Sequence, residues 1–366
     1  MNYRIGILGR TGRGDYGHAT DEAFVGLPNC QTVAVADDDK AGLAAMAKKH
    51  NVDQAYADYR ELLDKARPDI VVIGQRWLDR HRDMAVAAAE RGIHVYMEKP
   101  FCRTLAEADE IVTAGERTHA KLALAHPTRY SPKLATVKRL IDERAIGKVL
   151  EYRGRGKEDR RGGGEDLWVL GTHVMDAIRA LAGHPAWCFA RVTSGGHPIT
   201  KADVVEGAEG IGPLAGDAVT AMYGLPGGAT AYFQSVRNMA GKGSRYGLQI
   251  YGSAGIFEVL EGTMPSVKYL GDPSWSPGRS KSAWQDVSTA GIGKPETLTD
   301  SLWQNRHRPA ALDLLQAIEE DRQPLSSAYE ARGATEMIVA VFESHRVGGP
   351  VELPLKNRRN PLTILK

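Results

Sequence analysis

The sequence predicts an α/β protein in which a doubly wound parallel sheet precedes an α+β domain with an open, mostly antiparallel sheet. Over residues 1–125, short apolar runs alternate with helical patterns, which is typical of parallel strands covered on both faces. A glycine-rich segment directly follows the first of these runs. Beyond this region, strand-like runs follow one another without helices between them. We therefore expect domains at 1–125 and 126–366, with a C-terminal helix packing back on the first.

Composition limits the classes of partner. A chain of 366 residues is long enough for two hydrophobic cores, and its formal net charge of +2 favours neither nucleic acid nor an anionic membrane as partner. The three cysteines are scattered, without metal-ligand spacing, which favours a reduced setting over a disulfide framework. No signal segment or run of about 18 apolar residues is present. We expect a cytoplasmic protein without a metal.

The elements of the first domain are marked by apolar runs and by helix caps. Asp58 with Glu61, and Thr104 with Glu107, have the spacing of a capping box, and Gly92 stands where a helix ends. The predicted strands are 4–8, 32–36, 69–73, 94–97 and 122–125.

The second domain opens with Ser131 and Pro132, a helix N-cap followed by a first-turn proline. Strands are predicted at 149–153, 218–223, 229–235 and 248–251, and helices at 309–319 and 328–347. The Leu225–Gly228 turn predicts a hairpin between two of the strands. Segment 261–300 is rich in Gly, Pro and Ser and is predicted to be a loop.

The glycine-rich segment between Gly9 and Gly17 predicts a Rossmann-type dinucleotide site. Glycines let the chain turn tightly out of the strand and approach a pyrophosphate, which then faces the amides of the next helix's first turn. Two registrations remain open. Gly12, Gly14 and Gly17 fit the fingerprint spacing, whereas Gly9 and Gly12 are its first two glycines if the loop is enlarged.

The acidic residue after the second strand points to NAD. Asp37 lies 20 residues beyond Gly17, where a carboxylate accepts hydrogen bonds from the adenosine ribose. Asp38 and Asp39 add negative charge, which opposes a 2′-phosphate and favours NAD over NADP. The guanidinium of Arg10 or Arg13 reaching a 2′-phosphate is the alternative.

The strand at 94–97 ends in Glu98-Lys99-Pro100, at the carboxyl edge where a doubly wound sheet binds its ligands. A lysine there can donate to a substrate oxygen, and desolvation lowers its pKa toward usefulness as an acid. The proline fixes the turn that carries the lysine. The alternative is a solvated surface lysine.

In combination, the motifs RIGILGRTGRG, GIHVYMEKPFCRTLAEADEIV, HPTRYSP and GGGEDLWVLGTHVMDAIRALAG resemble the Gfo/Idh/MocA family of NAD(P)-dependent oxidoreductases. The resemblance implies a Rossmann domain, a second domain whose outer sheet face builds homodimers or homotetramers, and Lys99 beside the nicotinamide and the reacting substrate oxygen. The predicted cofactor contacts are Gly9, Arg10, Thr11, Gly12, Arg13, Asp37, Gly74, Gln75, His81, Glu98 and Lys99.

The segment around Gly171-Thr172-His173 carries the predicted acid–base chemistry. Oxidising an alcohol requires a base for the hydroxyl proton, and histidine titrates near neutral pH. By resemblance, His173 is the catalytic histidine. Where sugar and polyol dehydrogenases of the family often have an aspartate, this chain has Val169. Asp166 and Asp176 are the candidates for the missing carboxylate.

Predicted substrate contacts extend beyond the catalytic residues. Arg129 matches a family turn, and Arg155 belongs to a basic cluster that either meets an anionic sugar acid or is a solvated edge. Arg76 and Trp77 replace smaller residues of the family near the nicotinamide ribose and narrow the cleft, unless they are solvated and packed, respectively. The predicted substrate contacts are Lys99, Arg129, Arg155, Trp168 and His173.

The resulting hypothesis is an NAD-dependent dehydrogenase acting on a sugar, glycoside, polyol or sugar acid, a small molecule rather than a nucleic acid or membrane. Two alternatives stay open. One is a redox-neutral enzyme that oxidises transiently to cleave a glycosidic bond. The other is a non-catalytic NAD- or sugar-sensing regulator.

Overall fold

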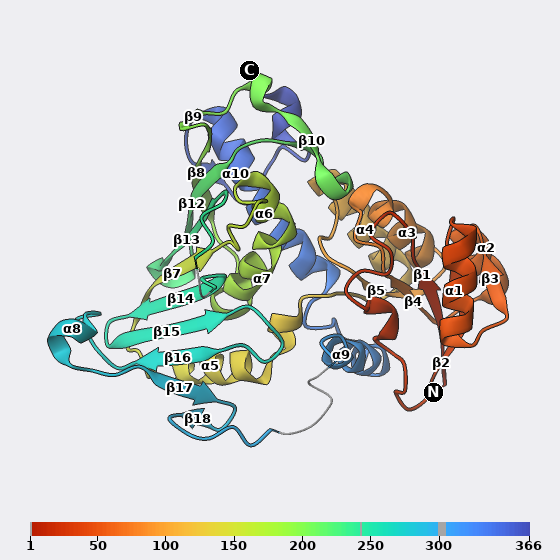
Figure 1. Cartoon of the computed structure of the whole chain (residues 1–366), viewed down its shortest axis with the longest axis horizontal. Helices are drawn as coiled ribbons and strands as arrows, with labels where there is room; N and C mark the ends of the chain where they lie inside the picture. The colour runs from red at the N-terminus through yellow and green to blue at the C-terminus, as the bar shows by residue number, and fades with distance from the viewer. Residues whose placement is uncertain (1, 242–243, 299–304) are drawn as a thin grey trace. The chain divides into compact units, whose positions relative to one another are not determined.

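The computed structural model describes residues 2–241, 244–298 and 305–366 (Figure 1). Within these residues the chain forms two compact units. The N-terminal unit comprises residues up to Ala125 together with 207–212 and 305–332, and the C-terminal unit comprises the remaining described residues. Each unit is described by itself below.

The N-terminal unit contains a parallel sheet with strand order β3-β2-β1-β4-β5-β6, which confirms the predicted fold class. All five predicted strands are present, and the short strand β3 was missed. The strands are β1 (Tyr3–Leu8), β2 (Cys30–Ala36), β3 (Gln54–Tyr56), β4 (Ile70–Ile73), β5 (His94–Met97) and β6 (Leu122–Leu124). The main helices are α1 (Lys40–His50), α2 (Tyr59–Glu61), α3 (His81–Ala89), α4 (Leu105–Thr118) and α9 (Arg308–Glu319).

Helix caps follow the predicted positions. Asp58 accepts from the Arg60 amide at 2.7 Å, and Thr104 accepts from the Glu107 amide at 3.1 Å. In turn, the Glu107 carboxylate accepts a hydrogen bond from the amide of Arg103, one residue before the cap. Side chains of α3, α4 and the π-helical turn η2 (Leu62–Ala66) pack on one face of the sheet. Val95 and Met97 of β5 point toward this face, and Tyr96 between them points toward the other.

The connection from β1 to β2 corrects one expectation. The predicted helix after the glycine loop does not form, and residues 10–26 make successive turns around a three-residue 3₁₀ helix, η1 (Thr20–Glu22). The face of the sheet that carries Tyr96 is contacted by these turns and by residues near α9. The Tyr96 hydroxyl bonds to His307 at 2.8 Å, and its ring lies edge-on to Phe24. Glycines and positive backbone φ values in the loop favour turns over a helix.

The C-terminal unit contains a sheet of strand order β18-β17-β16-β15-β14-β7-β13-β12-β8-β19. Strands β7 and β13 pair in parallel and the other described pairs are antiparallel, which confirms the predicted mostly antiparallel sheet. The strands include β7 (Val149–Arg155), β8 (Trp187–Ser194), β9 (His197–Pro198), β12 (Ala218–Gly224), β13 (Thr230–Val236), β14 (Gly247–Gly252), β15 (Gly255–Leu260) and β19 (Val351–Glu352). A separate pair is formed by β10 (Val205–Gly207) and β11 (Gly212–Leu214).

The prediction of a loop over 261–300 was wrong for part of its length. The sheet continues there through β16 (Val267–Leu270), β17 (Gln285–Ser288) and β18 (Gly291–Ile292), with a short helix α8 (Pro277–Ser280) between the first two. Residues 299–300 lie outside the described residues. These strands are two to four residues long, so the Gly, Pro and Ser of their connections dominated the composition.

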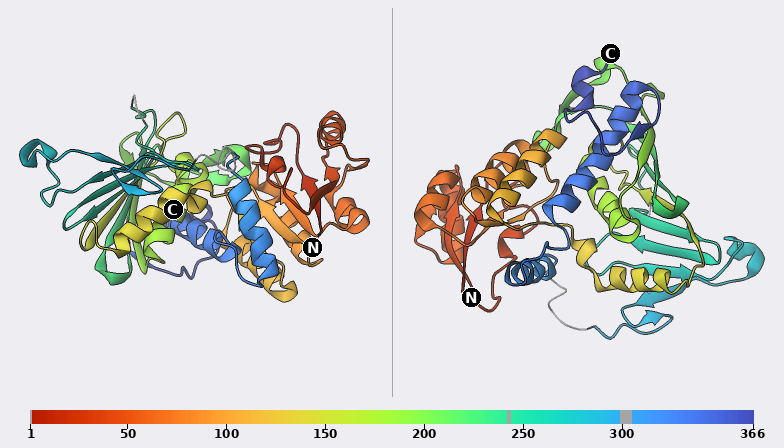
Figure 2. Two further views of the ribbon diagram at one scale, coloured as in Figure 1. Left: turned by 90° about the horizontal axis from the view of Figure 1, so that it is seen from below. Right: turned by 180° about the vertical axis from the view of Figure 1, so that it is seen from behind.

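Helices cover one face of this sheet and leave the other open (Figure 2). The helices are α5 (Pro132–Asp142), α6 (Gly164–Val169), α7 (Gly171–Ala182) and the later turns of α10 (Ala328–Val347). A Cβ on Gly154 of β7 would lie 2.5 Å from Val174 of α7, so this position faces the helices. Its neighbours Arg153 and Arg155 therefore project from the open face. No helix among the described residues has the length and hydropathy of a membrane span.

Candidate active site

The glycine loop of the N-terminal unit is a compact set of turns. Arg10 and Asp15 form an isolated β-bridge, and φ is +75° at Gly12 and +89° at Gly14, where a side chain is disfavoured. A Cβ on Gly9 would lie 2.1 Å from the ring of Tyr16, so glycine there lets this tyrosine fold back over the end of β1. The loop therefore approaches β1 and β2 closely without a helix N-terminus.

Asp37, predicted to bind the adenosine ribose, is enclosed by its own chain. Only 2% of the residue is exposed. Its carboxylate accepts from the Thr11 amide at 3.1 Å, the Thr11 hydroxyl at 2.7 Å, the Tyr16 hydroxyl at 2.8 Å and the Asp39 amide at 2.9 Å. Thr11, also a predicted cofactor contact, turns its hydroxyl toward this carboxylate. Both residues shape the loop from within.

The next carboxylate along the chain faces a cavity. Asp38 pairs with Arg10 at 2.9 Å and with Arg80 at 3.2 Å, and Arg10 also bonds to Asp79 at 2.7 Å. The cavity has a volume of about 400 Å³ and lies at the carboxyl ends of β1, β2 and β3. It is lined by Gly9, Arg10, Ala36, Asp37, Asp38, Ala57, Asp58, Tyr59, Arg60, Arg80, Asp83 and Met84.

Lys99 follows β5 at the same carboxyl edge, beside the buried carboxylate of Glu98. Glu98 accepts from the Thr20 hydroxyl at 2.6 Å and lies 3.2 Å from His18 Nδ1. Burial opposes ionisation, but the hydrogen bond with His18 and the charge of Lys99 outweigh it and hold the Glu98 pKa below its usual range. The Glu98 carboxylate therefore ties the glycine loop to the turn that carries Lys99, which is a positioning role.

Two further predicted cofactor contacts lie inside the protein. The ring of His81 is fully buried, with Nδ1 2.8 Å from the Pro100 carbonyl and Nε2 2.8 Å from the Gln75 carbonyl. His81 therefore links the Gly74-Gln75 turn to the turn after Lys99, and its predicted contact with the cofactor stays a prediction. Gln75 donates to the Trp77 carbonyl at 2.7 Å, and its own side-chain oxygen is buried without a partner among the described residues.

Arg76 and Trp77 are engaged within the N-terminal unit. The Arg76 guanidinium lies 3.5 Å from Glu209, and the Arg13 guanidinium stacks 4.5 Å over the Trp77 ring. The stacking of Arg13 is compatible with a packed tryptophan, and Arg76 is 38% exposed beside Glu209, so both readings of this turn stay open. The contacts place two cationic side chains on the loops at the carboxyl edge of the sheet.

The residues at this edge fit a dinucleotide. The cavity lies where doubly wound sheets bind nucleotides, its volume is within the range of ligand pockets, and cationic side chains stand beside it. The expected helix N-terminus is missing, so charged side chains such as Arg10 and Arg13 are the available partners for a pyrophosphate.

In the C-terminal unit, His173 lies on α7 within a buried polar cluster. The ring of His126 meets the ring of His173 edge-on, with centroids 5.4 Å apart. His126 Nδ1 is 3.3 Å from Asp176, and its Nε2 is 3.1 Å from the Thr172 hydroxyl. Arg129 donates from Nε to both Asp176 oxygens at 2.9 Å. The structure thus brings three predicted residues together and adds His126, which stands in the quoted HPTRYSP motif but was not singled out.

The carboxylates of this cluster differ in their ionisation. Burial opposes the ionisation of Asp176, but the charges of Arg129 and His126 outweigh it and hold the pKa of Asp176 well below its usual range. Glu261, which follows β15, bonds to the Thr128 hydroxyl. Burial, with a contribution from the charge of Asp176, raises the pKa of Glu261 to about 7. Sequence reasoning missed Glu261, because it stands in the segment read as a loop.

Asp166 lies near the start of α6. It is fully buried and accepts from the Ser235 hydroxyl and from the Glu158 amide, so it holds the turn before α6, and its Oδ1 is buried without a partner among the described residues. Burial raises the pKa of Asp166, against the hydrogen bond from Ser235. Gly156 allows this close approach, because a Cβ there would lie 2.1 Å from the Asp166 carboxylate. The predicted catalytic role of Asp166 stays a prediction.

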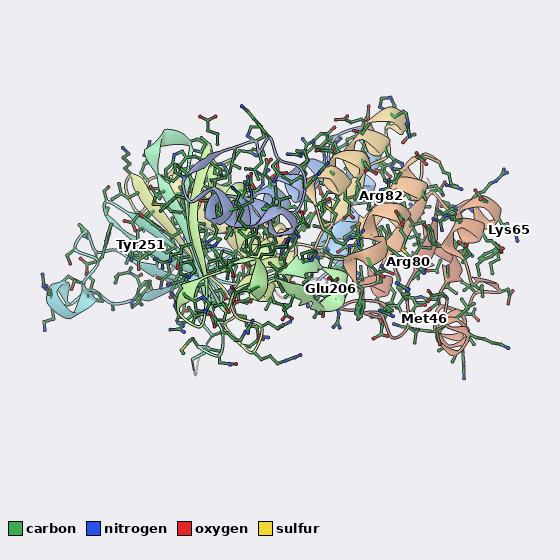
Figure 3. All side chains as sticks on the ribbon, turned by 90° about the horizontal axis from the view of Figure 1, so that it is seen from above. Met46, Lys65, Arg80, Arg82, Glu206 and Tyr251 are labelled. Carbon is green, nitrogen blue, oxygen red and sulfur yellow. The ribbon has the colours of Figure 1, made fainter. Side chains whose placement is uncertain are left out.

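Two predicted substrate contacts, Trp168 and Arg155, lie in different surroundings and stay predictions. Trp168 is among the largest fully buried side chains, so it packs in the core of the unit. Arg155 projects from the open face of the sheet, opposite to α7, and pairs there with Glu158 at 3.0 Å and with Gln234 at 2.6 Å. Its neighbour Arg153 stacks 4.0 Å over Tyr251, which is labelled in Figure 3. The basic cluster is thus largely internally paired and lies away from His173.

The fold, the cavity at Asp38 and the polar cluster at His173 define a two-domain, dinucleotide-dependent oxidoreductase. Residues 3–126 match the oxidoreductase family with an NAD-binding Rossmann fold, and residues 134–258 match the GFO/IDH/MocA C-terminal domain. The chain therefore belongs to the Gfo/Idh/MocA family, and its N-terminal unit is an NAD-binding Rossmann domain.

Individual relatives include dehydrogenases of sugars and polyols. Levoglucosan dehydrogenase of Pseudarthrobacter phenanthrenivorans is 28% identical over 292 residues, which cover 70% of this chain and 73% of that protein. The NAD-dependent scyllo-inositol 2-dehydrogenase of Bacillus subtilis is 30% identical over 151 residues, 41% of this chain and 43% of that protein.

Solved structures resemble the whole chain. Levoglucosan dehydrogenase in complex with NADH and levoglucosan has a TM-score of 0.77 at 22% identity, covering 97% of this chain and 100% of that one. An aldose-aldose oxidoreductase from Caulobacter crescentus, complexed with glycerol, has a TM-score of 0.73 at 18% identity, covering 96% and 100%. At these identities the likeness shows the fold.

Proposed function

We propose that this protein is an NAD-dependent dehydrogenase that oxidises or reduces a hydroxyl-bearing carbon of a sugar, glycoside, polyol or sugar acid. The observation that carries the proposal is the turn after β5, where Lys99 stands at the ligand-binding edge beside an ionised, buried Glu98. Family membership and the sugar dehydrogenases among the relatives support the substrate class.

The proposed roles divide between the two units. NAD, when bound, supplies the acceptor for the hydride that leaves the substrate carbon. Lys99 donates a hydrogen bond to the substrate oxygen, and Glu98, positioned by Thr20 and His18, favours the charged form of the lysine. His173 takes the hydroxyl proton during oxidation and returns it during reduction.

The partners of His173 support its acid–base role. Asp176 stays ionised beside Arg129 and His126, and the ring of His126 in turn meets the ring of His173 edge-on. Arg129 is thereby committed to Asp176, and we propose it as a positioning residue rather than a substrate contact. Within the N-terminal unit, we propose Gly9, Arg10, Gly12, Arg13 and Gly74 as residues that approach the cofactor.

Substitution of Lys99 tests this function. Lys99→Met keeps the length of the side chain and removes its charge, so kcat is expected to fall roughly 10²–10⁴-fold while NADH binding changes little. Lys65→Met, at an exposed lysine of the same unit, is the matched control and should retain full turnover. Turnover is followed by nicotinamide absorbance over a panel of anhydrosugars, aldoses, polyols and sugar acids. Full activity of Lys99→Met would contradict the assignment.

The same panel separates the two alternatives. Glycoside cleavage without a net change in nicotinamide absorbance, by protein that purifies with bound cofactor, would replace the dehydrogenase with the redox-neutral enzyme. Binding of NAD and sugar without any turnover would replace it with the sensor.

We further propose a cytoplasmic homodimer or homotetramer. The three cysteines are unpaired, as expected in a reducing compartment, and the open sheet face presents large apolar side chains such as Phe189 and Tyr232. Light scattering coupled to size-exclusion chromatography measures the assembly, and a monomeric mass would reject this part of the proposal.

A further inference from the structure

Arg76 is a cation at the ligand-binding edge of the N-terminal sheet, and the proposed function gives it no role. It follows β4 by three residues, and Lys99 follows the neighbouring strand β5 by two. The two turns are joined through His81, whose Nε2 lies 2.8 Å from the Gln75 carbonyl and whose Nδ1 lies 2.8 Å from the Pro100 carbonyl. Arg76 therefore belongs to the same edge of the sheet as the proposed catalytic lysine.

The glycine loop packs directly on Arg76. A Cβ on Gly14 would lie 2.6 Å from the Arg76 amide nitrogen, and the φ of +89° at Gly14 also disfavours a side chain. The adjacent ring of Trp77 is covered by the Arg13 guanidinium at 4.5 Å. Arg76 thus contacts the loop that is proposed to approach the cofactor, and its own turn is joined to that of Lys99.

The guanidinium of Arg76 is incompletely paired. Its Nε is buried without a hydrogen-bond partner among the described residues, and its Nη2 lies 3.5 Å from Glu209, which is longer than a good hydrogen bond. The side chains are 38% exposed at Arg76 and 26% exposed at Glu209, so water can reach the pair. Because such an exposed pair contributes little stability, another carboxylate can replace Glu209 at low cost.

Glu209 is held in place independently of this ion pair. It lies between β10 and β11, where residues 207–212 cluster with the N-terminal unit. In this segment Ile211 is fully buried, and a Cβ on Gly210 would lie 3.1 Å from Asp79. The segment is therefore anchored by packing, and loss of the ion pair is not expected to release it.

We propose that Arg76 binds the carboxylate of the substrate, which narrows the substrate class to sugar acids of the aldonic or uronic type. The inference rests on the proposed dehydrogenase function. A planar guanidinium binds a carboxylate through two parallel, charge-assisted hydrogen bonds, whereas a neutral hydroxyl offers neither the charge nor the second acceptor. Glu209 is the partner of Arg76 in the free protein, and a bound substrate replaces it. The guanidinium therefore keeps a counter-charge in both states.

Matched substrate pairs test the proposal. Each pair combines an acid with its neutral counterpart, such as D-glucuronate with D-glucose and D-gluconate with D-glucitol, over several epimers. The kcat/KM for the acid is divided by that for its neutral counterpart, both measured from nicotinamide absorbance at low ionic strength, where charges are least screened. In Arg76→Gln this ratio is expected to fall at least about tenfold, or about 1.4 kcal/mol. The fall should come from a higher KM for the acid, with turnover of the neutral sugar nearly unchanged.

Three further variants separate substrate binding from a structural role, and thermal melting verifies that each is folded. Arg76→Lys keeps the charge but not the planar fork, so it is expected to recover only part of the ratio. Glu209→Gln removes the competing carboxylate and is expected to raise the ratio by up to about fivefold, because the pair it breaks is weak. Arg82→Gln, at a paired arginine that is 40% exposed and labelled in Figure 3, should leave the ratio within about twofold.

The results distinguish this proposal from the function on which it rests. If the wild-type protein turns over neutral sugars as well as acids, if Arg76→Gln slows both members of a pair equally, or if Glu209→Gln lowers the ratio, the role of Arg76 is rejected and the dehydrogenase stands. If the folded wild-type protein turns over no member of the panel, the proposed function is rejected as well. A preference for acids that is lost in Arg76→Gln and strengthened in Glu209→Gln supports Arg76 as the carboxylate site.

Discussion

Around Asp38 in the N-terminal unit, carboxylates and guanidinium groups pair at a cavity open to water, whereas around Asp176 in the C-terminal unit the same groups pair inside the protein. Asp38 is 39% exposed, with Arg80 40% exposed; Asp176 is 1% exposed, with Arg129 9% exposed. Water can replace a partner at the first site but not at the second. Single substitutions at the cavity around Asp38 can therefore change ligand binding at little cost in stability. Substitutions in the buried cluster around Asp176 are expected to destabilise the C-terminal unit.

The sharpest contrast is expected from Asp176→Asn. This substitution leaves Arg129 and His126 in a buried site without their counter-charge, so the unit is expected to lose about 3–5 kcal/mol of unfolding free energy. Asp142→Asn is the matched control, because Asp142 is 64% exposed and pairs with Lys138 on the surface of α5. Denaturant unfolding measures both, and hydrogen exchange localises the loss. Equal costs at the two positions would remove the distinction between buried and exposed pairs.

Glu98→Gln extends the comparison to the buried carboxylate of the N-terminal unit. The neutral amide keeps the shape but weakens the bonds from Thr20 and His18, so a loss of about 1.5–3 kcal/mol is expected. This cost is smaller than at Asp176, because His18 is partly exposed and water can solvate it. Glu90→Gln, at an exposed pair with Arg117, serves as control in the same unfolding experiment. A larger loss at Glu90 than at Glu98 would contradict the assignment of Glu98 as the tether of the loop.

Local signals predicted much of the fold. The apolar strands of the N-terminal sheet, the N-caps Asp58 and Thr104, and helix α10 follow from residues close together in the chain. The strands that were not predicted include short ones, such as β3 and β16 to β18, whose surroundings are dominated by turn residues, and also the longer strands β8 and β15. Their pairing with neighbouring strands, rather than their own composition, makes them strands.

The candidate site was less predictable, because the state of each residue depends on distant ones. Gly9 and Asp37 line the cavity at the carboxyl edge of the sheet, but Thr11 and Tyr16, 26 and 21 residues from Asp37, occupy its carboxylate. Their spacing from His173 did not decide between Asp166 and Asp176 as the missing carboxylate. Only Asp176 meets Arg129, which is 47 residues away, whereas Asp166 meets Ser235.

The pH dependence of the C-terminal cluster is expected to change in Glu261→Gln. The folded protein binds the Glu261 proton more tightly than the unfolded chain, since the pKa rises from 4.5 to about 7. Stability from this group is therefore present below pH 4.5 and is lost as the pH rises toward 7. The variant should lack this loss, so its unfolding free energy should fall less steeply with pH over that window. Identical slopes in the two proteins would show that Glu261 titrates normally.

The smallest effect on stability is expected from Arg80→Gln at the nucleotide cavity. Its pair with Asp38 is exposed on both sides, so its loss is expected to change the unfolding free energy by less than about 1 kcal/mol. Arg82→Gln, at a neighbouring arginine that is also 40% exposed but pairs with Asp83 and Glu110, should have a similarly small effect. Arg80 lines the cavity at the carboxyl edge of the sheet, whereas Arg82 is not among its lining residues. A loss of unfolding free energy at Arg80 as large as that at Asp176 would mean that the exposed pair supports the fold. The contrast between the exposed pair at Asp38 and the buried pair at Asp176 would then fail.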